Sequence, residues 1–201
     1  MDDMVKAAMA KWPNVPHCYG WLGLSARGDW YMRDDRAQAA GPFVAPPGTD
    51  PARRAASRGS LLQHGKLIDF IQRNYLCDPP QPGGHDSHHS QGRWFFQNGP
   101  QRVYVELEAT PLIWRVEHTD PGFAVTAHTG EPARVQRCLL DEQGRVYLDT
   151  DVGFGLVHTL DMLLAADAIE QGLWVPQEVE AHDLPARFAY VRSPAQAHAL
   201  A

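Results

Sequence analysis

An apparent internal repeat is the feature of this sequence that most restricts how the chain can fold. The segment LSARGDWYMRDD begins at Leu24 and the segment LDEQGRVYLDTD begins at Leu140, with an offset of 116 residues. Four positions agree at this offset, and they are Leu24/Leu140, Gly28/Gly144, Tyr31/Tyr147 and Asp35/Asp151. Such self-similarity predicts two structural units that share one plan.

The repeat extends along the chain if the two units carry loops of different length. The offset between matching residues falls from 116 to 94 and then to 80. These two decreases equal the lengths of residues 36–57 and residues 77–90, which are 22 and 14 residues. The pairs that align after these changes are His64/His158, Gly92/Gly172 and Tyr104-Val105/Tyr190-Val191. The alternative interpretation is that glycine–aromatic hairpins recur by chance in a β-rich chain.

Two loops and two helices are predicted around these repeats. Residues 36–57 are rich in Ala, Pro, Gly and Arg without apolar periodicity, which is typical of a mobile surface insertion. Residues 77–90 combine turn-forming Pro and Gly with a histidine cluster and indicate a second exposed loop. A helix is predicted from Ser60, where Ser60 and Gln63 form a capping box, and another in LVHTLDMLLAADAIEQG, ended by Gly172.

The remaining segments have the pattern of strands and turns, so the predicted fold class is α+β. We expect two related halves from an internal duplication, each a curled antiparallel sheet with one main helix. The first half spans residues 17–105 and the second spans residues 106–193. Residues 1–16 form an N-terminal extension, and residues 194–201 form a C-terminal tail.

Composition and charge favour a globular protein of the cytoplasm. The 201 residues are 44% hydrophobic, the net charge is −6 and the pI is about 5.9. This charge argues against broad nucleic-acid or anionic-membrane binding. The first residues are acidic and lack the apolar run of a signal peptide, and three separated cysteines fit neither a disulfide framework nor a CxxC metal site. No cofactor is predicted.

The segment RWFFQNGPQRVYVELEATP, from Arg93 to Pro111, predicts a β-hairpin with Asn98-Gly99 at its turn. Glu106 and Glu108 would lie on one face of its second strand, roughly 6 to 7 Å apart. That spacing is near the spacing of the carboxylate pairs of glycoside hydrolases. The simpler interpretation is that both acids lie on the solvated face of an amphipathic strand.

Two histidine-containing motifs have ordinary explanations that we favour. The HDSHH motif in the second loop, with His85, His88 and His89, has ligands for a divalent transition metal, but its Pro-Gly-Gly flank argues against a rigid site. No metal-site residues are therefore assigned; adventitious metal binding is the favoured interpretation, and a functional metal site is the alternative. GFGLVH places two glycines before a helix, yet His158 stands where a dinucleotide-binding fingerprint requires its third glycine. A tight turn accounts for these glycines.

Three segments carry a family resemblance: KWPNVPHCYGWLGL, WFFQNGPQRVYVELEATP and GFGLVH. With them, the chain resembles an uncharacterised proteobacterial family of unknown function over most of its length outside the two loops. Its layout is more distantly similar to another bacterial family with a duplicated core, whose second half resembles a pleckstrin-homology fold. That resemblance implies signalling or ligand binding and supplies no catalytic residue.

The favoured hypothesis is a non-enzymatic protein that binds a small ligand or a protein partner, in signalling. We expect its site in a groove between the halves, where the hairpin meets the starts of the helices; the candidate residues are Arg102, Tyr104, Glu106, His64 and His158. Arg102 would hold a carboxylate or phosphate, and Glu106 would orient it. The alternatives are a hydrolase that uses Glu106, Glu108 and a histidine, and a structural or assembly role.

Overall fold

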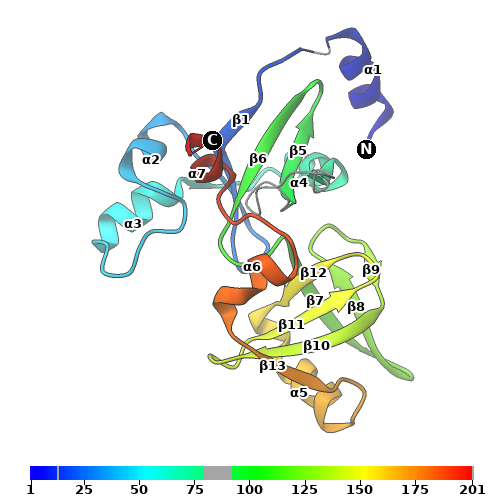
Figure 1. Ribbon diagram of the computed structural model, residues 1–201. Coiled ribbons are helices and arrows are strands. Elements are labelled where there is room, and N and C mark those ends of the chain that lie inside the picture. Colours follow the sequence, from blue (N-terminus) through cyan, green and yellow to red (C-terminus); the bar gives the residue numbers. More distant parts are fainter. Residues whose placement is uncertain (13, 79–91, 201) are drawn as a thin grey trace. The chain divides into compact units, whose positions relative to one another are not determined.

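The structure is a computed structural model that describes residues 1–12, 14–78 and 92–200 (Figure 1). The chain forms two compact units. Unit 1 comprises residues 1–25, 29–108 and 190–201, and unit 2 comprises residues 26–28 and 109–189. Each unit contains one sheet with helices, so the α+β class is confirmed. Among the described residues, none of the helices has the length and apolar character needed to cross a membrane.

Unit 1 is built on a six-stranded sheet in the order β3-β2-β1-β6-β5-β4. Its strands are β1 (Cys18–Leu24), β2 (Trp30–Met32), β3 (Ser60–Leu61), β4 (Tyr75–Asp78), β5 (Arg93–Asn98) and β6 (Gln101–Leu107). Its helices are α1 (Asp3–Lys11), α2 (Asp35–Ala40), α3 (Pro51–Arg58), α4 (Gly65–Arg73) and α7 (Pro194–Ala199). All neighbouring strands are antiparallel except β1 and β6, which are parallel.

Unit 2 is built on a seven-stranded sheet in the order β13-β10-β11-β12-β7-β8-β9. Its strands are β7 (Leu112–Thr119), β8 (Gly122–Ala127), β9 (Pro132–Ala133), β10 (Val135–Asp141), β11 (Val146–Thr150), β12 (Phe154–Val157) and β13 (Pro176–Val179). Its helices are α5 (Met162–Glu170) and α6 (Leu184–Arg187). Its core includes Ile113, Trp114, Leu139 and Leu148, all fully buried.

Both sheets are mixed, whereas the sequence analysis expected antiparallel sheets. In unit 2 the pairs β10–β13 and β12–β7 are parallel. A parallel pair requires a crossover connection, and the chain between β10 and β13 supplies one through two strands and α5. The antiparallel expectation came from the hairpins, which join neighbouring strands, and it therefore missed the pairs formed by distant segments.

The two units share one three-stranded part, which is β1–β2–β3 in unit 1 and β10–β11–β12 in unit 2. The hairpin pairs of unit 1 are Leu22↔Met32, Gly23↔Tyr31 and Leu24↔Trp30, and those of unit 2 are Cys138↔Leu148, Leu139↔Tyr147 and Leu140↔Val146. Gly28 and Gly144 occupy the two turns with φ of 82° and 74°, a conformation that glycine adopts without strain. A third antiparallel strand follows in each unit, β3 or β12, and then a histidine at a helix start.

The similarity does not extend to the expected ends of the halves. Tyr190 belongs to unit 1 and bridges to Gly92, while the last strand of unit 2 is β13. Residues 106–108 also belong to unit 1, because β6 continues to Leu107 beside β1. The observed units therefore differ from the expected spans of 17–105 and 106–193, and the final Tyr-Val pairs are not equivalent.

Residues 36–57, expected to be a mobile loop, instead contain most of α2 and α3. The Asp34 and Asp50 side chains accept hydrogen bonds from the first turns of these helices, and Pro51 occupies the first turn of α3. Phe43 lies in the core between them. The segment contains few apolar residues, but the two helix caps and the buried Phe43 ring stabilise its structure. In the other expected loop, Cys77 and Asp78 end β4, and residues 79–90 lie outside the described residues.

The helix predicted from Ser60 begins five residues later, at Gly65. Ser60 and Leu61 pair with Met32 and Tyr31 as strand β3, so they are unavailable to a helix. The helix cap is His64, whose Nδ1 accepts a hydrogen bond from the Leu67 amide at 3.3 Å. The apolar periodicity correctly predicted the body of this helix. The predicted capping box of Ser60 and Gln63 was wrong, because the helix cap is His64.

Candidate functional site

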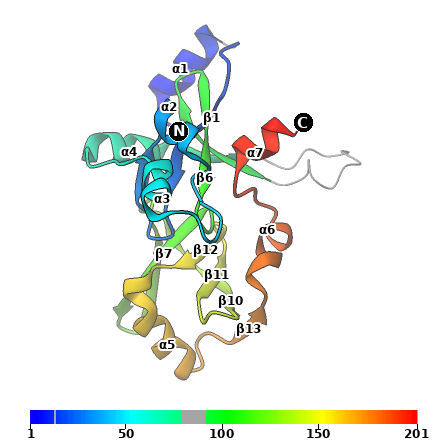
Figure 2. The ribbon, with the colours of Figure 1, turned by 90° about the vertical axis from the view of Figure 1, so that its left-hand side faces the viewer.

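The unit 1 sheet presents two different faces to the helices that cover it. Figure 2 shows α4 and α7 on opposite sides of β1 and β6. Side chains alternate along a strand, so Val103 faces the α4 side while Arg102, Tyr104 and Glu106 face the α7 side. A groove lies on the first face, and an aromatic cluster with a buried acid lies on the second.

The groove beside α4 has a volume of about 280 Å³ and an apolar lining. Phe70 of α4 and Phe96 of β5 meet edge to face, with ring centroids 5.4 Å apart. Trp21 and Met32 are 42% and 47% exposed. The lining residues are Cys18, Trp21, Leu22, Met32, Leu67, Phe70, Ile71, Phe96, Asn98, Gln101 and Val103. None of these described residues carries a charge.

Polar groups of the groove come from four of these side chains: Cys18, Trp21, Asn98 and Gln101. Cys18 is partly exposed, and the Gln101 amide donates a hydrogen bond to the Pro16 carbonyl at 2.9 Å. Small-molecule sites are typically concave and mostly apolar, with a few polar groups that fix orientation. The groove has this composition, at a volume suited to a compact ligand.

Two larger cavities in unit 2 have a different chemistry. One, of about 570 Å³, is lined mainly by acids: Asp141, Glu142, Glu178, Glu180 and Asp183. The other, of about 560 Å³, lies beside Trp174 and includes Arg134 and Arg137. Both arginines are already in ion pairs, with Asp151 and Asp149. The unit 1 groove therefore resembles a ligand site most closely.

On the opposite face, Arg102 and Tyr104 both contact the carboxylate of Asp78. Arg102 Nη1 and the Tyr104 hydroxyl donate to the two oxygens of Asp78, each at 3.1 Å. The Tyr104 ring stacks on Tyr19 at 4.7 Å, and the Tyr19 ring stacks on His198 of α7 at 4.1 Å. Sequence analysis did not identify Tyr19, Asp78 or His198.

Glu106 is part of the attachment of α7. Its side chain is buried, and its two carboxylate oxygens accept hydrogen bonds from Ser193 Oγ at 2.5 Å and the Ala195 amide at 3.0 Å. Burial raises the pKa of Glu106, against the opposing effect of these hydrogen bonds and of Arg33. These contacts hold the start of α7, so the direct interpretation is that Glu106 has a structural role.

Glu108 is held by a different element. Arg58 of α3 donates to both Glu108 oxygens, at 2.9 and 2.7 Å, and stacks its guanidinium over Tyr31 and Phe43. Bidentate pairing of this kind fixes both side chains. Because Glu106 and Glu108 bind separate structural partners, the geometry does not favour the hydrolase alternative.

The two candidate histidines both cap helix starts and belong to different units. His64 is exposed in unit 1, as described above. His158 of unit 2 is buried, and its Nδ1 accepts from the Leu160 amide at 3.1 Å at the 3-10 turn that leads into α5.

Asp161, one turn after His158, anchors that turn to β7. It accepts two hydrogen bonds from Arg115, at 2.6 and 3.1 Å, and one from the Val116 amide at 3.0 Å. Burial acts to raise the pKa of Asp161, but the bonds and charge of Arg115 outweigh it and lower the pKa. These hydrogen bonds give Asp161 a structural role, which is to hold the start of α5 against β7.

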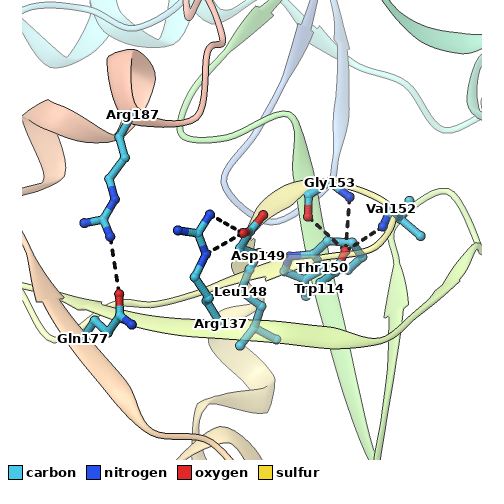
Figure 3. A network of polar contacts seen from close by, with 9 residues as sticks. All are labelled: Trp114, Arg137, Leu148, Asp149, Thr150, Val152, Gly153, Gln177 and Arg187. Carbon is cyan, nitrogen blue, oxygen red and sulfur yellow. Dashed lines mark hydrogen bonds and ion pairs between the residues drawn. The ribbon is translucent and has the colours of Figure 1, made fainter.

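Polar contacts of the same kind hold the β-strands of unit 2 together (Figure 3). Arg137 pairs with Asp149 across β10 and β11, and Arg187 of α6 donates to Gln177 of β13. Trp114 Nε1 donates to the Leu148 carbonyl at 3.0 Å in the core. These donors and acceptors pair with one another, so these contacts need no ligand to account for them.

Within residues 1–12, 14–78 and 92–200, no group of three or more His, Cys, Asp or Glu side chains could hold a metal ion. The HDSHH motif lies outside these residues. The described residues that line the groove beside α4 are aromatic, aliphatic and uncharged polar side chains.

The fold and the groove define an α+β protein with two mixed sheets and a concave apolar site in its first unit. Residues 1–195 match the family described as "Protein of unknown function (DUF2946)", and the chain belongs to this family. No curated protein matches it. A DUF1285 family protein from Silicibacter pomeroyi DSS-3 has a similar structure, with a TM-score of 0.42 and 11% identity over 77% of this chain and 72% of that chain.

Proposed function

We propose that this protein is a non-enzymatic binder of a small, largely apolar molecule, held in the unit 1 groove between α4 and the sheet. The supporting observation is the uncharged lining of that groove, in which aromatic rings surround the space and polar groups are few. Transfer of apolar surface from water into such a site favours binding by about 25 cal/mol per Å².

The chemistry of the groove supports binding rather than catalysis. General acid–base catalysis needs a titratable side chain within hydrogen-bond reach of the reacting group. The described lining contains one ionisable group, the Cys18 thiol, and no imidazole or carboxylate beside it. Catalytic thiols are ordinarily activated by an adjacent base or a nearby cation, and the described lining supplies neither. This groove therefore fits recognition of a ligand.

Filling the groove tests this proposal. Leu67→Trp on α4 places a larger side chain in the space, and we expect it to weaken binding of a neutral naphthalene probe by at least tenfold, because the volume that the probe needs is occupied. Leu61→Trp is the matched control, since Leu61 is exposed on β3 and does not line the groove. Probe binding is followed by fluorescence titration.

Thiol labelling supplies an independent measurement of the same site. Cys18 lines the groove and Cys77 does not, while Cys138 is buried. The bound probe is expected to slow maleimide labelling of Cys18 in a Cys77→Ser background and to leave Cys77 labelling unchanged in a Cys18→Ser background. Equal binding by the two Trp variants, or equal protection of the two thiols, contradicts the proposal.

We also infer that the two units arose by internal duplication. The matching hairpin registers, and the histidine cap that follows the third strand in each unit, support this inference. The resemblance to a bacterial family with a duplicated core and a pleckstrin-homology-like half agrees with it. Aligned relatives are expected to show half-to-half similarity over residues 18–73 and 134–170, outside residues 36–57. Similarity no greater than for shuffled halves contradicts the duplication.

A further inference from the structure

The α7 face of the unit 1 sheet carries a stack of flat rings at its surface. Tyr104 of β6 and Tyr19 of β1 lie almost parallel, with 9° between their planes, and the His198 imidazole covers Tyr19 with 6° between planes. His17 and Phe95 meet Tyr104 edge on and hold its orientation. Tyr19 is therefore a rigid aromatic platform with a nitrogen heterocycle on it.

The element that brings His198 to this platform is weakly held. Helix α7 has six residues, of which only Pro194 is buried. A helix this short is unstable by itself in water, so its position depends on a few tertiary contacts. Those contacts include the hydrogen bonds of Ser193 and Ala195 to Glu106 and the stack of His198 on Tyr19. Just before the helix, the Arg192 carbonyl accepts from the Leu107 amide and the Arg192 guanidinium donates to the Glu108 carbonyl.

Local opening of such an element requires less free energy than global unfolding. When α7 moves away, the face of Tyr19 becomes accessible while Tyr104, Phe95 and Asp78 keep the platform in place. The imidazole of His198 thus occupies the position of a flat ligand, in the way that an intramolecular competitor occupies a site.

We propose that the stacked pair Tyr19 and Tyr104 forms a second binding site, for planar nitrogen heterocycles of the size of a nucleobase, and that His198 of α7 is its internal occupant. The site lies on the face of the sheet opposite the apolar groove and does not depend on the function proposed for that groove. Its ligand class follows from the ring that already stacks there and from the tolerance of aromatic platforms for bases of any sequence.

Competition by His198 lowers the apparent affinity of such a ligand. Only molecules with an open platform bind it, so the apparent dissociation constant is the intrinsic one divided by the open fraction. Removing the imidazole raises this fraction without changing the platform. The substitution His198→Ala therefore separates a ligand site from ordinary helix packing, because packing alone gives no gain in binding.

The experiment uses the full chain and four probes: adenosine, guanosine, cytidine and uridine. Isothermal titration calorimetry of His198→Ala is expected to show at least one nucleoside bound about tenfold more tightly than by the wild type, a change of the order that base stacking produces. His182→Ala is the matched control, because His182 is an exposed histidine of unit 2, and it should bind as the wild type does.

Two further variants in the His198→Ala chain test the platform itself. Tyr19→Leu removes the ring and should reverse the gain, whereas Tyr19→Phe keeps the ring and should retain it. Circular dichroism checks that each variant is folded, and if Tyr19→Leu fails to fold, the comparison of His198→Ala with wild type still decides. No gain for any of the four nucleosides, or an equal gain in His182→Ala, overturns the proposal.

Discussion

We expect Arg33→Met to lose about 3 kcal/mol of unfolding free energy, because it removes several charge-assisted hydrogen bonds from buried carbonyl groups. Arg33 is 3% exposed. Its guanidinium donates to the carbonyls of Ser57 at 2.8 Å, Gly20 at 2.9 Å and Gly41 at 2.5 Å. These bonds connect β1 to the C-terminal ends of α2 and α3, and methionine fills similar space without any donor.

Urea unfolding measures this loss, with Arg36→Met as the matched control. Arg36 is an exposed residue of α2, so its replacement should change the unfolding free energy by less than about 0.5 kcal/mol. Arg33→Lys should lose nearly as much as Arg33→Met, since one ammonium group cannot span three carbonyls in a plane. A stable Arg33→Met chain would show that the α2–α3 segment is held by other contacts.

Residues 36–57 were predicted to be a mobile loop but are ordered in the structure, and the reason lies in contacts with other parts of the chain. Local patterns are visible in the sequence, and the Asn98-Gly99 pattern correctly predicted a hairpin turn. The α2–α3 segment has little apolar periodicity, so it has the composition of a loop. Its order depends on Arg33, which precedes the segment, and on the burial of Phe43. Neither the hydrogen bonds of Arg33 nor the burial of a single Phe43 ring produces a periodic pattern in the sequence.

The candidate sites were predictable only in part, for the same reason. Arg102 and Tyr104 were candidate site residues, and in the structure both contact Asp78, which no sequence pattern singled out. The apolar groove, by contrast, combines residues of β1, β2, α4, β5 and β6. Its formation requires the parallel pairing of β1 with β6, whose register depends on contacts between distant segments.

His198 shows a further limit of local reasoning. The last residues were expected to be a C-terminal tail, and their sequence alone gives no partner for a lone histidine. In the structure Glu106, far away in the sequence, accepts the hydrogen bonds that place α7 on the sheet. The strand pattern had assigned Glu106 to ligand orientation, whereas its described contacts orient a helix.

We expect acid to destabilise unit 2 through His128, by roughly 1.4 kcal/mol per pH unit between the unfolded and folded pKa values. His128 follows β8, and its Nδ1 accepts a hydrogen bond from the Ile113 amide at 3.3 Å. Its Nε2 is shielded from solvent. Burial lowers the pKa of His128 from about 6.5 to about 3, because the charged imidazolium is poorly solvated there.

The sign of the effect follows from proton uptake. Between pH 6.5 and pH 3 the unfolded chain carries a proton on His128 that the folded chain lacks, so lowering the pH favours unfolding. The stabilisation is complete above pH 6.5 and is lost as the pH falls toward about 3. From pH 6.5 to 4.5 the loss from this residue is about 2 to 3 kcal/mol.

His128→Asn isolates this contribution, because its side-chain oxygen can accept the Ile113 hydrogen bond but cannot titrate. Urea unfolding at a series of pH values should give the variant a shallower dependence of stability on pH between 6.5 and 4.5, whatever its stability at pH 7. His182→Asn, at a histidine whose side chain is 78% exposed, should keep the wild-type slope. Parallel curves for wild type and His128→Asn would show that His128 is solvated enough to accept its proton in the folded protein, and would remove burial as the origin of the acid sensitivity.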